Sequence, residues 1–122
     1  MDNKTTIQEL KLRVKKYCED RDWDKFHNPK DLSIALSTEA SELLELFLWK
    51  SNEQIEKMLQ KPEKKQEIKE EMADILYVLL RLAQMNEIDL SAEFEKKMVK
   101  NAEKYPIDIV KGKNNKYTEY KK

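Results

Sequence analysis

Residues 32–49 read LSIALSTEASELLELFLW, and this stretch decides the fold. Its apolar residues recur at helical spacing, and from Leu43 to Trp49 they wrap most of a helix circumference. Residues 75–82 (ILYVLLRL) are apolar on as many sides. A helix that is hydrophobic all round must be covered on all sides. The two stretches therefore predict an all-α fold, a bundle of four to five helices that assembles into an oligomer through its long apolar helices.

Two pairs of acids interrupt these apolar helices, Glu39 with Glu42 and Glu71 with Asp74. Residues three apart on a helix are neighbours, with about 5–6 Å between their Cβ atoms, so each pair can direct two carboxylates at one point. A highly charged chain can also carry such acids on an exposed surface. Buried carboxylates, however, need compensation, and a hard divalent cation with oxygen ligands supplies it most simply. The two pairs predict a metal site.

The composition limits the class of protein. The chain has 122 residues with one Gly, three Pro and 39% charged residues, and its formal net charge is zero. This length fits a single domain over residues 1–122, and the balanced charge argues against a nucleic-acid binder. Cys18 is the only cysteine, the N-terminus lacks a signal-peptide pattern, and no apolar run reaches the ~18 residues of a membrane span. We therefore expect a cytoplasmic protein that binds neither nucleic acid nor membrane.

Helix boundaries are marked by capping residues and prolines. Asn28 followed by Pro29 is a strong helix start, and Ser51 or Asn52 can cap a short helix. The last helix has to stop before Pro106. We expect helices over about residues 5–20, 29–50, 53–60, 62–86 and 90–104, with 106–122 as an extended tail.

Further candidate residues lie outside the acid pairs. His27 is the only histidine, which excludes a ferritin-like di-iron site, because that site needs Glu-x-x-His motifs on two helices. Trp23 and Trp49 flank the acidic helix and either fill the core or stack on a nucleobase. Lys97 and Asn101 lie one turn apart on the last helix, either on a solvated face or as contacts for a polyphosphate.

The order of these motifs resembles a known family. The ExxE motif at residues 39–42, followed after 28 residues by ExxD at 71–74, resembles the all-α nucleoside triphosphate pyrophosphohydrolases of the MazG-like group. Within this group the chain is most similar to the dCTP pyrophosphatase branch. The segments that follow that branch in order are RDWDKFHNP, ELFLWK, KEEMADILYVLLRLA, KMVKNAEKYP and KYTE. The resemblance covers about residues 7–120.

The resemblance implies hydrolysis of a nucleoside triphosphate, dCTP or a related dNTP, to the monophosphate and pyrophosphate. It implies Mg²⁺ as the cofactor, with Mn²⁺ as a candidate replacement, and a homotetramer built as a dimer of dimers. Glu39 or Glu42 would take the proton of the attacking water, and the sequence does not choose between them. Carried over by position, the metal ligands are Glu39, Glu42, Glu71 and Asp74, and the substrate-binding residues are Trp23, His27, Trp49, Lys97, Asn101 and Tyr105.

Two alternatives stay open from the sequence. A related helical enzyme of other base preference, such as a dUTPase, would share the acids. The branch carries a Tyr four residues beyond the last acid, where this chain has Val78, with Tyr77 before it, so base contacts at that place differ. A non-catalytic helical assembly module would bind metal or nucleotide without releasing pyrophosphate, and the complete set of four acids argues against it.

Overall fold

The computed structural model describes residues 1–120, which are helical and contain no β-strand. The predicted all-α fold is therefore confirmed. The chain divides into two compact units, Met1–Glu87 and Ile88–Lys122. Within residues 1–120, no helix combines the length and the apolar character needed to cross a bilayer.

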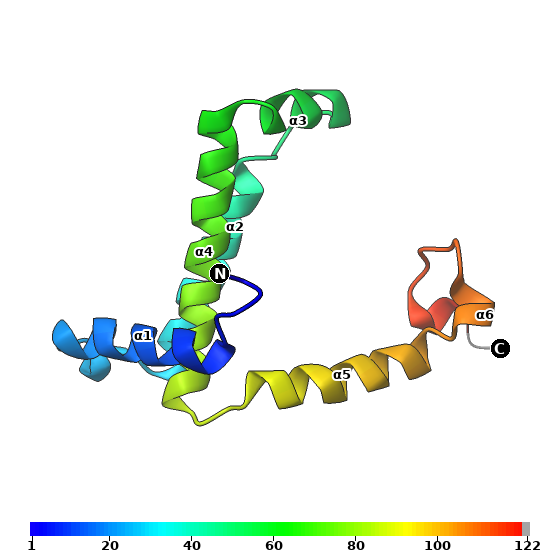
Figure 1. The fold of residues 1–122 in the computed structure, drawn as a ribbon. Helices are drawn as coiled ribbons and strands as arrows, with labels where there is room; N and C mark the ends of the chain where they lie inside the picture. The colour runs from blue at the N-terminus through cyan, green and yellow to red at the C-terminus, as the bar shows by residue number, and fades with distance from the viewer. Residues whose placement is uncertain (121–122) are drawn as a thin grey trace. The chain divides into compact units, whose positions relative to one another are not determined.

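In the first unit, one long helix is the common packing partner of the others (Figure 1). This helix, α4, packs most extensively against α2 and also against α1 and α3. A short 3₁₀ turn, η1, lies in the loop before α2. The bounds of these elements are α1 Ile7–Asp20, η1 Asp24–Phe26, α2 Pro29–Glu45, α3 Asn52–Leu59 and α4 Pro62–Met85.

The helix starts follow the capping residues in the sequence. The side-chain oxygen of Asn28 accepts a hydrogen bond from Asp31 N at 2.8 Å, and Pro29 occupies the first turn of α2. Ser51 and Gln54 form a reciprocal capping box at the start of α3. These side chains satisfy backbone N–H groups that have no partner within the helix. Both predicted starts are confirmed.

The end of α2 differs from the prediction. The helix stops at Glu45 rather than near Lys50, and Leu46–Trp49 form a turn in which Leu46 N donates to Leu43 O at 3.2 Å. The physical reason is the N-cap of α3. Ser51 has the extended backbone that an N-cap requires, so the chain must leave helical geometry before Ser51.

The second unit contains α5 (Leu90–Lys104), as predicted, with Asp89 as its N-cap. The extended tail predicted for 106–122 is wrong over part of its described length, because α6 (Ile107–Val110) and η2 (Tyr117–Tyr120) are helical turns. Pro106 presets the backbone before α6. Tyr117 N donates to the hydroxyl of Tyr105 at 3.3 Å, and the two rings meet edge to face. Residues 121–122 lie outside the described part of the chain.

Large apolar side chains remain exposed on the two helices that the sequence predicts to be apolar on many sides. Leu44 of α2 is 59% exposed and Met72 of α4 is 57% exposed. The buried apolar residues of the first unit are Cys18, Leu32, Met58, Ile68, Val78, Leu80 and Ala83. The first unit by itself therefore leaves apolar surface on α2 and α4 without cover.

A buried arginine fastens the loop around η1 to α4. Arg81 is 1% exposed. Its Nε donates to Nδ1 of His27 at 2.9 Å, and its Nη1 donates to Gln84 Oε1 at 2.6 Å. Its Nη2 forms an ion pair with Asp24 of η1. A single planar guanidinium thus satisfies three acceptors in a fixed fork, and an ammonium group cannot reproduce that geometry.

We predict that Arg81→Lys lowers the free energy of unfolding by about 1–3 kcal/mol, because at least one of the three acceptors around the buried Arg81 loses a charged donor. Chemical denaturation measures the change. Arg13→Lys is the matched control, since Arg13 is exposed, and it should stay within about 0.5 kcal/mol of the wild type. Equal stability of Arg81→Lys and the wild type would show that the hydrogen bonds of the Arg81 guanidinium do not stabilise the fold.

Candidate metal centre

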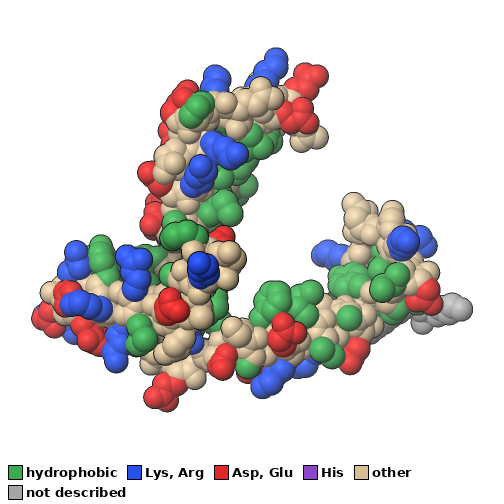
Figure 2. Space-filling model, in the orientation of Figure 1, with side chains coloured by type: hydrophobic (Ala, Val, Ile, Leu, Met, Phe, Trp, Pro, Cys, Tyr) green, Lys and Arg blue, Asp and Glu red, His purple; other side chains and the backbone are tan. Residues whose placement is uncertain are grey.

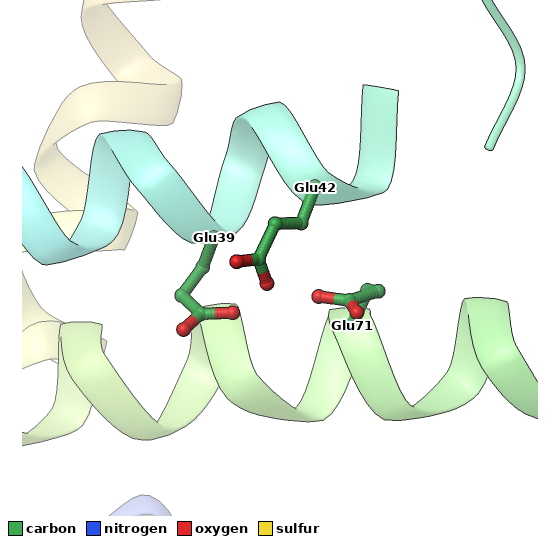
Figure 3. A group of neighbouring side chains, drawn as sticks. All are labelled: Glu39, Glu42 and Glu71. Atoms are coloured by element: carbon green, nitrogen blue, oxygen red, sulfur yellow. The ribbon is translucent and has the colours of Figure 1, made fainter. Parts of the chain in front are cut away.

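Three predicted ligands come together between α2 and α4. Glu39 and Glu42 project from α2, Glu71 projects from α4, and their carboxylates point toward one another (Figure 3). One oxygen from each carboxylate can be chosen so that all three lie within 4.8 Å of one another. The three-residue spacing on α2 gives two neighbouring acids, and the packing of α2 on α4 supplies the third.

Within residues 1–120, no lysine or arginine forms an ion pair with the acids of this cluster. Glu39 Oε2 and Glu71 Oε2 are buried and make no hydrogen bond. Burial above all, then the hydrogen bond and charge of Glu42 and the charges of Asp74 and Glu71, raise the pKa of Glu39 to about 7. Burial, then the hydrogen bond and charge of Glu42 and the charge of Asp74, raise the pKa of Glu71, and a hydrogen bond with Glu39 opposes this shift. An all-oxygen donor set with orphaned buried atoms fits a hard divalent cation such as Mg²⁺.

Asp74, the fourth predicted ligand, lies one turn further along α4 and is exposed. Its carboxylate is outside the group of three. It lines a pocket of about 480 Å³ between α1 and α4, together with Tyr17 and Tyr77. Its negative charge nevertheless raises the pKa of Glu39, so the two carboxylates interact electrostatically. Its role as a ligand stays a prediction.

The loop before α2 carries two of the predicted substrate-binding residues, Trp23 and His27, and both are half-buried. Their rings meet edge to face with centroids 6.2 Å apart. Burial and then the positive charge of Arg81 lower the pKa of His27, so the imidazole is neutral at pH 7. Because its Nδ1 accepts from Arg81, the ring proton is on Nε2. The loop offers an aromatic ring and a single imidazole N–H donor.

Trp49 lies away from Trp23, after the opposite end of α2. It is 92% exposed and has a left-handed backbone with φ of 63°. This conformation is uncommon for a bulky residue, and here it ends the turn that follows α2. With 17 residues, α2 is about 25 Å long. The two tryptophans of one chain therefore cannot stack on the same base.

Lys97, Asn101 and Tyr105 belong to the second unit. Lys97 is exposed and Asn101 is half-buried on α5, and the Tyr105 hydroxyl accepts from Tyr117 N. Their function as substrate-binding residues stays a prediction.

Arg81 is not among the residues that the sequence predicts to be functional. It is the one cation in the apolar run of residues 75–83, and a buried cation needs an acceptor. That signal predicts a partner acid, but the acid is Asp24, in a loop 57 residues earlier. Helical periodicity alone does not connect two such distant segments.

We predict that the metal-free chain loses stability as the pH rises from about 4.5 to about 7. Because folding raises the pKa of Glu39 from its ordinary value of 4.5 to about 7, its contribution is complete below 4.5 and is lost as the pH passes the folded-state pKa. Thermal unfolding in a chelator at pH 5 and pH 8 measures this.

The matched comparison is Glu39→Gln, whose stability should depend less on pH than that of the wild type. The lowered pKa of His27 makes stability rise with pH, which is opposite to the effect of Glu39. Because His27 is present in both proteins, its effect cancels when the pH profiles of Glu39→Gln and the wild type are compared. Mg²⁺ at pH 8 should raise the wild-type melting temperature. Parallel pH profiles for the two proteins would contradict the electrostatic assignment.

Known proteins are similar to this chain in sequence and in structure. The model of the MazG-like family matches residues 34–120. The dCTP pyrophosphatase 1 proteins of Rattus norvegicus and Homo sapiens are 33% and 32% identical to the chain over 114 residues, which are 93% of the chain and 67% of each relative. A crystal structure of a pyrophosphatase from Archaeoglobus fulgidus matches with a TM-score of 0.75 and 38% identity, over 81% of this chain and 91% of that one. The chain belongs to the MazG-like family.

Proposed function

We propose that this protein hydrolyses a nucleoside triphosphate, dCTP or a related dNTP, to the monophosphate and pyrophosphate with the help of Mg²⁺. The observation that carries the proposal is the cluster of Glu39, Glu42 and Glu71, with two buried carboxylate oxygens that have no hydrogen-bond partner among residues 1–120. The family and the pyrophosphatase relatives support the reaction class. The names of the curated relatives support dCTP as the first substrate to test.

The carboxylates would act in two ways. Glu39, Glu42, Glu71 and Asp74 would hold the metal, and bound Mg²⁺ would supply positive charge against the phosphates and a more acidic water. In the reaction, water adds to the α-phosphorus and the bond to the leaving pyrophosphate breaks. Glu39 or Glu42 would accept the proton from that water, since a carboxylate oxygen beside the reacting atoms can serve as a general base.

The nucleotide would be recognised by residues outside the carboxylate cluster. Trp23 and His27 form one candidate wall, with a ring to stack on a base and an Nε2–H to donate. Trp49 is exposed enough to contact a nucleotide. Because it lies far from Trp23, it would contact a different part of the nucleotide along α2, or a nucleotide bound to a neighbouring copy of the chain. Lys97, Asn101 and Tyr105 would contact phosphate or sugar.

We predict that Glu39→Gln and Glu71→Gln lower turnover at least about 100-fold at saturating Mg²⁺. Each change removes a proposed metal ligand, and even residues that only support ligands cost 10–100-fold. Each also relieves repulsion between acids, so both variants should fold and hold or gain stability without metal. Pyrophosphate release is measured for the eight common NTPs and dNTPs.

Glu70→Gln is the control for this experiment, since Glu70 is an exposed acid beside Glu71 and lies outside the cluster. It should keep wild-type turnover. Near-wild-type turnover of Glu39→Gln or Glu71→Gln would disprove the ligand assignment. Release from dUTP in preference to dCTP would favour the dUTPase-like alternative, and absence of release from all eight nucleotides would favour the non-catalytic module.

We also propose a homotetramer, a dimer of dimers located in the cytoplasm. The physical motive is the exposed apolar surface of α2 and α4, which includes Leu44 and Met72. Light scattering at micromolar concentration should give about 58 kDa, the mass of four chains of 14.6 kDa. A mass near 14.6 kDa would disprove self-association through these helices.

A further inference from the structure

A deeply buried cation lies near the end of α4, outside the carboxylate cluster. Figure 2 shows charged side chains spread over the surface of the molecule. Among residues 1–120, the buried charged side chains are Lys11 and Arg81, and Arg81 is the more deeply buried of the two at 1% exposed. Burying a cation costs free energy unless the cation is paired and hydrogen-bonded. The partners of Arg81 therefore indicate what this position does.

Two partners of Arg81 lie in the loop before α2, on either side of a single residue pair of η1. Its Nη2 pairs with Asp24, the first residue of η1. Its Nε donates to Nδ1 of His27, the residue directly after η1, at 2.9 Å. Trp23 directly precedes the turn as its N-cap. The guanidinium thus fixes both ends of η1 relative to α4, and with them the rings of Trp23 and His27.

The hydrogen bond from Arg81 also decides which ring nitrogen of His27 carries the proton. A guanidinium has only donors and keeps its charge in proteins, so Nδ1 remains an acceptor and the proton stays on Nε2. The imidazole is half-buried, and no group within residues 1–120 accepts a hydrogen bond from Nε2–H. His27 therefore presents one fixed donor whose partner is water or a ligand.

This donor lies beside the ring of Trp23. The centroids of the two rings are 6.2 Å apart, and their planes are inclined at 63°. A flat base that stacks on the indole therefore cannot stack on the imidazole as well, and the imidazole can contact it through Nε2–H. The acceptors that a base offers to such a donor are a carbonyl oxygen or an unprotonated ring nitrogen.

We propose that Arg81 is a positioning residue for nucleotide binding, which acts through His27 without touching the nucleotide. It holds the imidazole as a fixed N–H donor for an acceptor atom of the base, and it holds Trp23 beside that donor. The inference rests on the proposed function and makes base recognition depend on a buried side chain outside the metal centre. Groups held in their binding geometry favour affinity, because less conformational freedom is lost when the ligand binds.

The first test measures the protonation of the two ring nitrogens by ¹⁵N NMR of the untagged, ligand-free chain at pH 7. Because His27 is the only histidine, its ring gives the only imidazole signals. We expect a protonated Nε2 and an unprotonated Nδ1 in the wild type. Arg81→Met should show a mixture of the two tautomers, because Nδ1 has lost its donor.

Lys25→Gln is the matched control for the NMR measurement. Lys25 is an exposed cation of η1 that pairs with Asp22 and does not contact the imidazole, so its variant should give the wild-type ring signals. A mixture of tautomers in the wild type would overturn the proposal, as would wild-type ring signals in Arg81→Met.

The second test uses two substitutions of His27 that separate the acceptor from the donor. The amide oxygen of His27→Asn lies at about the position of Nδ1 and can accept from Arg81, but the side chain is too short to place a donor at Nε2. The longer side chain of His27→Gln brings an amide N–H to about the position of Nε2. Neither variant depends on whether Arg81→Met folds.

Binding of dCMP in Mg²⁺ is measured by calorimetry, with inorganic pyrophosphate as the ligand that has no base. We expect His27→Asn to bind dCMP about three- to tenfold more weakly than the wild type, the effect of losing one neutral hydrogen bond. His27→Gln should bind dCMP more tightly than His27→Asn, and pyrophosphate affinity should be the same in all three proteins. Wild-type affinity of His27→Asn for dCMP would overturn the proposal, as would an equal loss of affinity for both ligands or absence of dCMP binding to the wild type.

Neither measurement requires turnover, so this proposal and the proposed function can fail separately. A fixed tautomer and weaker dCMP binding in His27→Asn, without pyrophosphate release from any nucleotide, would support the role of Arg81 and refute the enzymatic proposal. Hydrolysis of a nucleotide with wild-type dCMP affinity in His27→Asn would do the reverse.

Discussion

Repulsion among three acids at the α2–α4 interface is the constraint on which the site depends. Packing of the two helices brings Glu39, Glu42 and Glu71 together and removes two of their oxygens from water. Such an arrangement is unfavourable for a free chain at neutral pH, because burial and like charge both oppose ionisation. The cluster therefore lowers the stability of the metal-free chain at neutral pH, and a divalent cation held by these oxygens would offset the repulsion.

Two polar groupings lie along α4. The carboxylate of Glu71 lies in the middle of the helix, and the buried Arg81, which contacts Asp24 and His27, lies near its end. α4 thus holds the carboxylate cluster and the loop of Trp23 and His27 at a fixed spacing through one rigid element.

Much of the fold could be predicted from local sequence signals. The apolar periodicity and the capping residues Asn28 and Ser51 predict helices that the structure confirms. The ExxE and ExxD spacing predicts four clustered acids, and the structure brings three of them within 4.8 Å while Asp74 lies outside the group. The predictions for the end of α2 and for the residues after Pro106 were wrong. The backbone at these places depends on caps and on contacts that lie outside the periodic segments. The contacts of Arg81 join residues from separate elements, and periodicity within one helix carries no information about such pairings.

The position of α4 has a consequence for folding. Because α1, α2 and α3 each pack on α4, none of them has a full set of tertiary partners until this helix is in place. Isolated helices of this length are marginal in water, so the first unit is expected to open and close as one cooperative block, with α4 among its slowest backbone amides to exchange. The metal centre would then be gained and lost with the whole unit and not by fraying of a single helix.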